Sequence, residues 1–269
     1  MVLVFDLNGT LLNSQALDPV LRTIFRGKLK ARDWFVEVLQ HSMAMSLAGD
    51  YRRLDEIAAG VLEMEAAARR IQLDTAGVAR VLAALRTLPP FKDVERTLQK
   101  LKQANFRLAV LSNSSLELLQ RQVSNAHMAA YFEQALSVEQ LRRYKPSTEL
   151  YEFAASSLGV PTGEILMVAA HHWDLLGAAR AGCQTAFIRR PGTALFPHAP
   201  APTYVAKDLA DLAGQLDPAL KPASTTAVMT AVTTAVAVAA AGVVIGAARS
   251  RWQSGKTGLL AGAAKFTTQ

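Results

Sequence analysis

Short apolar runs alternate with helix-length segments over the second half of the chain, and this alternation limits the fold more than any other feature. Two of the runs, FRLAVLSN (106–113) and EILMVAA (164–170), have the composition of buried strands. Strands that alternate with helices form parallel sheets covered by helices on both faces. We therefore expect an α/β fold, a Rossmann-like doubly wound parallel sheet. The expected strands are 2–7, 106–113, 135–138, 164–170, 183–188 and 203–206, and the expected helices are 93–104, 115–126, 146–158, 173–181 and 208–216.

A purely helical block interrupts this pattern after the first strand. Residues 15–88 lack strand signals and carry apolar residues at helical spacing, as in Leu54, Ile57, Ala58 and Val61. Pro89 and Pro90 close the block. We expect a Rossmann-like core formed by 1–14 and 91–218, with an inserted helical cap domain at 15–90.

The C-terminal segment, 219–269, differs from the rest of the chain. Ala223 to Ala248 is a run of 26 residues without a charge, and about 20 apolar residues suffice to cross a bilayer. Its abundant threonines and scarce Leu, Ile and Phe weaken that interpretation. The sequence leaves three readings open: a helix that spans a membrane, a helix that lies on its surface, and an extension without a membrane role.

The net charge of +7 is concentrated in the same C-terminal segment. Residues 221–269 hold five basic residues and no acidic ones, which leaves the preceding residues at +2. A nucleic-acid-binding domain would carry its basic residues on the folded body, so we expect no nucleic-acid partner. The single cysteine, Cys183, excludes an intrachain disulfide and a cysteine-based zinc site. The start MVLVFDLNGT does not resemble a secretory signal, so we expect a cytoplasmic catalytic domain.

Polar residues follow several of the expected strands. Ligands of open parallel sheets bind at the carboxyl ends of the strands. The candidates there are Asp6 with Thr10, Ser112 with Asn113, Lys145 and Asp174. Several strand ends that each deliver a polar residue predict a shared site.

The segments that carry these residues resemble the motifs of the haloacid dehalogenase superfamily. They are FDLNGTLLN (5–13), VLSNSS (110–115), YKPSTELY (144–151) and VAAHHWDLLGAARAG (168–182), in the order of that family. The resemblance covers about 1–216 and implies a nucleophilic aspartate at Asp6. The helical block matches the position of the family's cap.

The residue type at position 8 distinguishes two branches of this superfamily. Phosphatases of the family have a second aspartate there as general acid, and they bind Mg²⁺ with further carboxylates after the fourth strand. This chain has Asn8 and, after that strand, only Asp174. The type II 2-haloacid dehalogenases are the more similar branch, which implies a metal-free reaction without a cofactor. The resemblance implies that Asp6 displaces halide from a short 2-haloacid, and that water then cleaves the aspartyl ester to give a 2-hydroxy acid.

The resemblance also implies roles for individual residues. Lys145 would keep Asp6 ionised, and Asp174 would activate the hydrolytic water. A cap arginine would bind the leaving halide, and we choose Arg32 over its rival Arg26. His171 stands where the family often has asparagine. The expected substrate-binding residues are Thr10, Arg32, Ser112, Asn113, Tyr151 and His171.

Two other interpretations remain open at this point. The chain would be another hydrolase of the superfamily, such as a Mg²⁺-dependent phosphatase, or a non-catalytic domain displayed at a membrane. A homodimer is compatible with the sequence, which decides neither the oligomeric state nor the physiological substrate.

Overall fold

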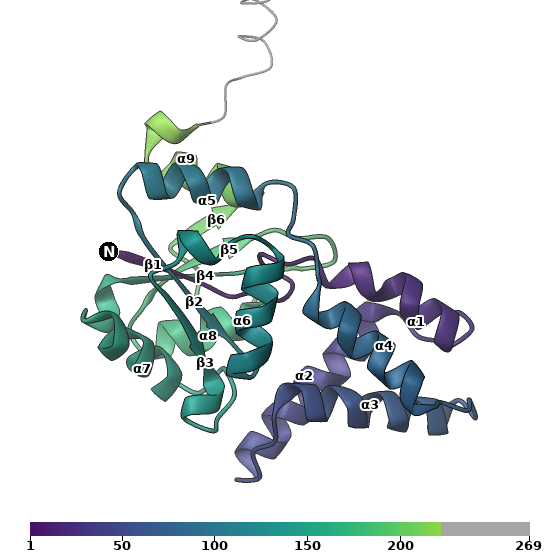
Figure 1. Cartoon of the computed structure of the whole chain (residues 1–269). Coiled ribbons are helices and arrows are strands. Elements are labelled where there is room, and N and C mark those ends of the chain that lie inside the picture. Colours follow the sequence, from purple (N-terminus) through teal and green to yellow (C-terminus); the bar gives the residue numbers. More distant parts are fainter. Residues whose placement is uncertain (222–269) are drawn as a thin grey trace, which may run out of the picture. The chain divides into compact units, whose positions relative to one another are not determined.

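A single parallel sheet organises the part of the chain that the structure describes, residues 1–221 of a computed structural model (Figure 1). Its six strands lie in the order β3-β2-β1-β4-β5-β6, and every neighbouring pair is parallel. This order confirms the expected doubly wound sheet. The strands are β1 (Val2–Phe5), β2 (Arg107–Ser112), β3 (Gln134–Ser137), β4 (Ile165–Ala169), β5 (Gln184–Ile188) and β6 (Tyr204–Ala206).

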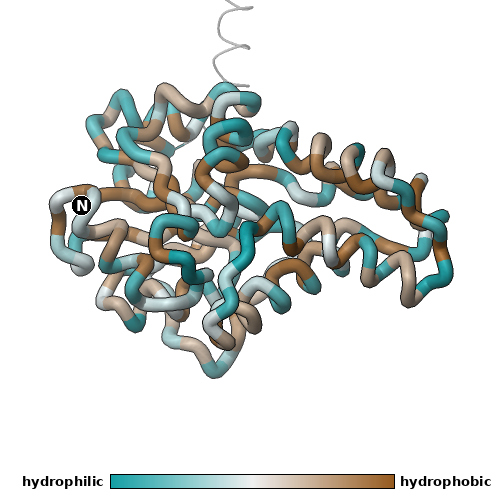
Figure 2. Tube along the Cα trace, turned by 60° about the horizontal axis from the view of Figure 1, so that its bottom comes forward, coloured by the Kyte–Doolittle hydropathy of each residue, from teal (hydrophilic) through white to brown (hydrophobic). Residues whose placement is uncertain are grey.

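Strand β1 lies in the middle of the sheet and pairs with both β2 and β4. Val2–Phe5 lie opposite 107–110 on one side and 165–168 on the other. All four residues of β1 are buried, as are the five residues of β4. Strands covered on both faces have this continuous apolar character, and Figure 2 shows it as hydrophobic segments through the centre of the body.

Helices cover both faces of the sheet. Figure 1 shows α5 and α9 along one face and α7 with α8 along the other, while α6 packs beside β3. These helices are α5 (Val94–Gln103), α6 (Leu116–Asn125), α7 (Glu149–Leu158), α8 (His172–Arg180) and α9 (Leu209–Leu216). Short 3₁₀ helices are η1 (Ser14–Leu17), η2 (Ala129–Tyr131), η3 (Val138–Gln140), η4 (Thr162–Glu164) and η5 (Pro218–Leu220).

Four helices form the insertion between β1 and β2, as the sequence predicts. Figure 1 shows them extending beyond the carboxyl ends of the strands, and we call this region the cap. Its helices pack on a shared apolar interior that includes Trp34, Leu62 and Val81, all buried. The cap helices are α1 (Asp18–Ile24), α2 (Ala31–Leu47), α3 (Leu54–Ala68) and α4 (Thr75–Arg86).

Side chains of the core hold the cap through its backbone carbonyl groups. Gln122 Nε2 donates to the Leu85 carbonyl at 2.9 Å, and the Tyr144 hydroxyl donates to the Arg52 carbonyl at 2.8 Å. Asn125 Nδ2 donates to another cap carbonyl at 2.9 Å. Cap and core together form one compact unit, Met1–Lys221.

The segment before α7 differs from the sequence prediction. The sequence places Pro146 at the start of this helix, but α7 begins three residues later, at Glu149. The Ser147 N–H instead donates to the Tyr144 carbonyl in a turn, and the Lys145–Pro146 bond is cis. Helix α8 packs directly on this turn at Gly177, where a Cβ atom would meet the Pro146 carbonyl. Only glycine permits that approach, which brings α8 beside Lys145.

The compact unit extends slightly further than the expected boundary at 218. Leu220 packs on the hydrophobic core, and Lys221 lies against Gly214 of α9. The helix or extension expected at 223–248 lies outside the described residues. Within residues 1–221, no helix is both long and apolar enough to span a bilayer.

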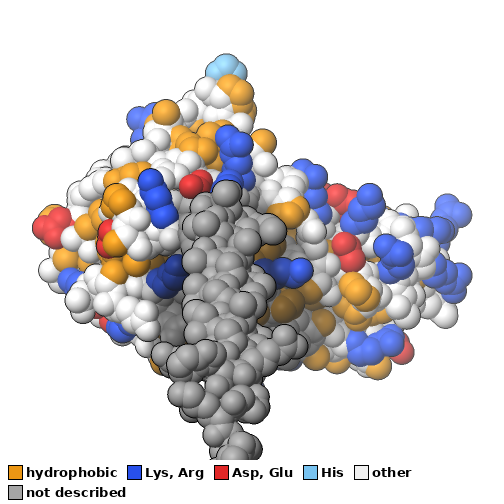
Figure 3. All heavy atoms as spheres, turned by 90° about the horizontal axis from the view of Figure 1, so that it is seen from above, with side chains coloured by type: hydrophobic (Ala, Val, Ile, Leu, Met, Phe, Trp, Pro, Cys, Tyr) orange, Lys and Arg blue, Asp and Glu red, His pale blue; other side chains and the backbone are white. Residues whose placement is uncertain are grey.

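Charged side chains are mixed on the face shown in Figure 3. Lys and Arg are scattered there among acidic and hydrophobic side chains and form no continuous stripe over the described residues. This distribution gives no support to a nucleic-acid surface on that face.

Candidate active site

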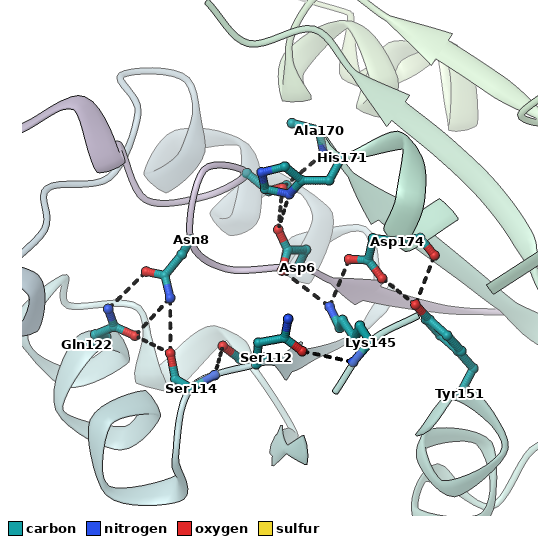
Figure 4. A network of polar contacts seen from close by, with 12 residues as sticks. Asp6, Asn8, Ser112, Ser114, Gln122, Lys145, Tyr151, Ala170, His171 and Asp174 are labelled. Atoms are coloured by element: carbon teal, nitrogen blue, oxygen red, sulfur yellow. Dashed lines mark hydrogen bonds and ion pairs between the residues drawn. The ribbon is translucent and has the colours of Figure 1, made fainter. Parts of the chain in front are cut away.

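The polar residues predicted at the strand ends meet beside the point where the strand order reverses. Asp6 follows β1, Ser112 ends β2, and His171 follows β4, while Lys145 reaches them from the turn before α7. Figure 4 shows Lys145 and His171 directed at Asp6, whereas Ser112 contacts Ser114. In doubly wound sheets this is where ligands bind.

Three side chains contact the carboxylate of Asp6. Thr10 Oγ1 donates to Oδ2 at 2.7 Å, Lys145 Nζ lies 3.2 Å from Oδ1, and His171 Nδ1 lies 3.1 Å from Oδ2. Burial raises the pKa of Asp6, but the charge of Lys145 and the hydrogen bonds from His171 and Thr10 outweigh it. The pKa of this carboxyl therefore lies well below its usual range, and Asp6 is an anion at neutral pH.

Lys145 is completely buried between two carboxylates. Its ammonium group lies 2.9 Å from Asp174 Oδ2 as well as 3.2 Å from Asp6 Oδ1. Burial lowers the pKa of Lys145, but attraction by Asp174 and Asp6 outweighs this effect and raises it. The ion pair with Asp6 thus agrees with the arrangement that the sequence predicts.

Asp174 and Tyr151 lie behind Lys145, away from the open part of the site. The Tyr151 hydroxyl donates to Asp174 Oδ1 at 2.6 Å, so that both carboxylate oxygens have partners. Asp174 is fully buried and Tyr151 is 1% exposed. Burial raises the pKa of Asp174, and burial next to that carboxylate raises the pKa of Tyr151.

The resemblance implies that Asp174 activates water and that Tyr151 lies near the substrate, and both roles stay predictions. Neither Tyr151 nor Asp174 lines the two hollows near Asp6. The physical reason is the close packing of α7 against α8. Within this packing Asp174 pairs with Lys145, and Tyr151 orients Asp174.

Ser112 and Asn113 lie on the side of Asp6 opposite to α8. Ser112 Oγ accepts from the Ser114 N–H at 3.1 Å, and Asn113 Oδ1 accepts from the Lys145 N–H at 3.1 Å. The Asn113 Nδ2 group is buried and has no hydrogen-bond partner within the described structure. Both residues line a small hollow together with Asp6. Asn113 therefore offers an unused donor beside the nucleophile candidate.

Asn8 belongs to a polar network that the sequence did not reveal. Asn8 Nδ2 donates to Ser114 Oγ at 3.0 Å, and Gln122 Nε2 donates to Asn8 Oδ1 at 2.9 Å (Figure 4). Gln122 also donates to the Leu85 carbonyl of the cap. The Asn8 side chain thus joins the loop after β1 to α6, and Gln122 extends this network to α4. Only the long-range packing of these elements identifies this role.

A larger cavity of about 720 Å³ opens beside the small hollow, between cap and core. Phe35, Leu39, His171 and Trp173 line both spaces. The His171 and Trp173 rings stack, with centroids 5.1 Å apart. A small molecule that enters the cavity would therefore reach Asp6 past two apolar cap side chains and an aromatic pair.

The structure distinguishes the two candidate cap arginines by position. Arg32 begins α2 and lines the large cavity, with its guanidinium group over Gly192. Arg26 follows the end of α1, is exposed, and lines neither space. Arg32 is thus the cap arginine near the site.

Arg190 is a second arginine at this cavity, which sequence reasoning missed. It follows β5 and is 8% exposed. Its Nε donates to the Thr10 carbonyl at 2.9 Å, its Nη1 pairs with Asp93 at 2.7 Å, and its guanidinium lies over the Phe91 ring. The rule that polar residues at strand ends build the site would have found it. Its contacts indicate that it supports the turn that carries Thr10.

The donor set near Asp6 is poor in metal ligands. No group of three or more His, Cys, Asp or Glu side chains within residues 1–221 is arranged to hold a metal ion. Asn8 and Asp174 are both engaged in the contacts given above.

The fold and the site together define an α/β protein with a helical cap and an ionised aspartate, paired with lysine, at the switch point of its sheet. Residues 1–182 match the model of the haloacid dehalogenase-like hydrolases. The chain belongs to this family of hydrolases.

Several relatives of this chain are dehalogenases. A haloacetate dehalogenase of Moraxella sp. (strain B) is 30% identical over 194 residues, which cover 71% of this chain and 87% of that protein. An (S)-2-haloacid dehalogenase of Pseudomonas sp. (strain YL) is 30% identical over 192 residues, covering 71% and 83%. The L-2-haloacid dehalogenase of Xanthobacter autotrophicus with covalently bound chloropropionic acid has a TM-score of 0.74 and 25% identity, and the match covers 80% of this chain and 98% of that one.

Proposed function

We propose that this protein hydrolyses short 2-haloacids to 2-hydroxy acids through an ester on Asp6. One observation carries the proposal: the ionised Asp6 carboxylate lies in the same hollow as the unpartnered Asn113 Nδ2 group. A nucleophile next to a free donor suits a substrate that carries its own carboxylate beside the reacting carbon. The named activities of the relatives support the same conclusion.

The proposed reaction has two steps. An oxygen of Asp6 attacks the carbon that bears the halogen, an ester bond forms, and the carbon–halogen bond breaks with release of halide. Water then attacks the ester carbonyl, which frees the 2-hydroxy acid and restores Asp6. Asn113 and Ser112 would bind the substrate carboxylate, and Arg32 would stabilise the departing halide. Thr10 and Lys145 would orient Asp6.

We further propose that the reaction needs no metal ion and no cofactor. In the Mg²⁺-dependent alternative, the residue at Asn8 would act as a general acid, but its amide cannot donate a proton in that way and is bound to Ser114 and Gln122. Mg²⁺ also prefers several oxygen ligands, which supports the dehalogenase over the phosphatase. A homodimer and membrane association through 223–248 stay predictions of the sequence.

Halide release from a panel of 2-haloacids tests the proposal. We expect release from chloroacetate, bromoacetate or 2-chloropropionate that continues after exhaustive treatment with EDTA. A parallel assay with aryl phosphates and added Mg²⁺ measures the alternative. Phosphate release with Mg²⁺, combined with no halide release, would overturn the proposed function and favour the phosphatase.

A further inference from the structure

The imidazole of His171 occupies the space next to the nucleophile. Its Nδ1 lies 3.1 Å from Asp6 Oδ2, and its side chain is 17% exposed. It lines both the small hollow and the large cavity. A group placed in this way contacts the Asp6 carboxylate and also borders both spaces through which water can approach it.

The ring of His171 is held on two sides. Trp173 stacks on one face, with an angle of 24° between the ring planes. On another side the ring lies over Gly9, where a Cβ atom would be 2.9 Å from its Cε1 and Nε2 atoms. Gly9 also has a φ of +84°, which favours glycine. The turn after β1 therefore provides the space that this ring needs.

Other polar groups around Asp6 are poorly suited to take a proton from water. Lys145 is an ammonium ion between two carboxylates. Thr10 donates to Asp6 and accepts from the Ala170 N–H. Asp174 is fully buried, and both of its oxygens already accept hydrogen bonds, from Lys145 and from Tyr151. Among the described side chains that contact Asp6, His171 alone combines access to the hollow with a basic lone pair.

We propose that His171 is the general base of the second step, the hydrolysis of the Asp6 ester. This inference rests on the proposed function and assigns the activation of water to a residue that the sequence predicts only to bind substrate. Once Asp6 is esterified, its charge is gone, and the imidazole tautomer with the proton on Nε2 can accept a proton through Nδ1 from a water molecule next to the ester.

Hydrolysis of the ester consumes one water molecule and restores both Asp6 and His171. Water forms a bond to the carboxyl carbon of Asp6 while Nδ1 takes one of its protons. The tetrahedral intermediate then breaks its bond to the substrate oxygen, and that oxygen receives the proton from Nδ1. The 2-hydroxy acid leaves, and Asp6 loses its remaining proton to solvent because Lys145 stabilises the carboxylate.

Single-turnover experiments on the full-length protein separate the two steps. His171→Asn and His171→Gln are mixed with chloroacetate, and free chloride and intact protein mass are followed together. We expect each variant to release about one equivalent of chloride and to accumulate the ester, with hydrolysis slowed at least about 100-fold. His127→Asn is the matched control, since His127 is exposed, has a φ of +55° and lies outside the site. It should show wild-type kinetics without an adduct.

Asp174→Asn provides the competing test. Ester accumulation in Asp174→Asn, but not in the His171 variants, would overturn the proposal and make Asp174 the base. Steady turnover by folded His171 variants, or loss of ester formation in them, would also overturn it. A wild-type protein that neither releases halide nor forms an ester would instead refute the proposed function.

Chemical rescue decides the case in which both sets of variants accumulate ester. His171→Ala leaves space beside Trp173 that added imidazole can occupy. We expect imidazole to accelerate ester hydrolysis in this variant, whereas thiazole, a similar ring of weaker basicity, should not. Equal effects of both rings, or no effect of either, would show that His171 only fills space. Circular dichroism of each variant verifies that it is folded.

Discussion

Lys145 and Asp6 form a buried ion pair across the centre of the molecule, with Nζ 3.2 Å from Oδ1, although 139 positions separate them in the sequence. Lys145 is fully buried and Asp6 is 5% exposed. A charged pair with so little water around it is costly unless its geometry is good, and it leaves Asp6 ionised. The same contact therefore serves the stability of the fold and the proposed chemistry.

Replacement of the nucleophile is the most direct test of that chemistry. Asp6→Asn should lower halide release at least about 10⁴-fold, because a neutral amide is a poor nucleophile. The thermal midpoint should still show a folded protein, since the oxygen of the introduced amide can accept a hydrogen bond from Lys145. Retained wild-type activity would contradict the role of Asp6.

Cys183 provides the control for adducts in the single-turnover experiments on the His171 variants. It is the only cysteine, it is buried, and burial raises the pKa of its thiol to about 12. Haloacids should therefore not alkylate it at neutral pH. The ester that accumulates in His171→Asn should persist when Cys183→Ala is added to that variant, and it should vanish when Asp6→Asn is added instead.

Removal of the lysine should destabilise the protein in a pH-dependent way. Lys145→Met leaves Asp6 and Asp174 buried without their cation, which should cost about 3–5 kcal/mol of unfolding free energy at pH 7. Without Lys145 the pKa of Asp174, which burial already raises, rises further above its value in the unfolded chain, and the pKa of Asp6 rises from its lowered value. The folded variant then binds more protons than the unfolded one, so its stability should rise as the pH falls from 7 toward about 4.

Urea unfolding at neutral and acidic pH measures this effect. In the wild-type protein the lowered pKa of Asp6 has the opposite effect: its contribution to stability is complete down to about pH 4 and is lost only in stronger acid. The difference between wild type and Lys145→Met should therefore shrink in acid. Lys102→Met, at an exposed position on α5, should stay within about 0.5 kcal/mol of wild type at both pH values. A difference that grows in acid would contradict the assigned charges.

The strands could be predicted from the sequence because their signals are local. Runs such as FRLAVLSN mark their own strand, and β2 at Arg107–Ser112 lies within the predicted 106–113. Asp6 could also be predicted as a site residue, because ligands of parallel sheets bind where the strands end and Asp6 directly follows the first strand. The start of α7 could not be predicted, because the turn that holds Lys145 depends on contact with α8, which lies far away in the sequence.

The orientation of site residues depends on packing that no local pattern contains. The sequence predicts Asp174 at the site, but its burial behind Lys145 follows from the close contact of Gly177 with the Pro146 turn. The sequence shows only that Asn8 replaces an expected acid, whereas its contacts with Gln122 come from the packing of the loop after β1 against α6. The burial of Asp174 and the contacts of Asn8 both depend on how neighbouring elements pack, and the sequence alone does not position those elements.

The two cap arginines offer a matched pair for testing the halide site. Arg32→Gln should lower kcat/KM for chloroacetate by about 10²-fold, because the guanidinium charge would stabilise the departing chloride. Arg26→Gln should leave kcat/KM unchanged, since Arg26 lies outside the cavity lining. Steady-state chloride release measures both. An equal loss in the two variants, or a loss in Arg26→Gln alone, would reject the choice of Arg32.

Truncation tests where the catalytic unit ends. The complete sheet and every proposed site residue lie within Met1–Lys221, so a chain cut after Lys221 should keep the kcat/KM of the full protein. A cut after Pro218 removes Leu220, which packs on the core, and should lower stability by about 1 kcal/mol without changing kcat/KM. Chloride release and thermal unfolding measure both effects.

The same truncation decides whether residues 222–269 contribute to catalysis or to membrane binding. If the chain ending at Lys221 fails to fold or loses activity, the later residues support the core, and the boundary at Lys221 is wrong. Sedimentation with anionic lipid vesicles supplies a second readout, because five basic residues lie at 221–269 and no acidic ones. The sequence prediction of membrane association requires that the full chain sediments with the vesicles and that the shortened chain, which retains Lys221 alone of these five, stays in the supernatant. Equal sedimentation of both chains would assign any lipid binding to the catalytic unit instead.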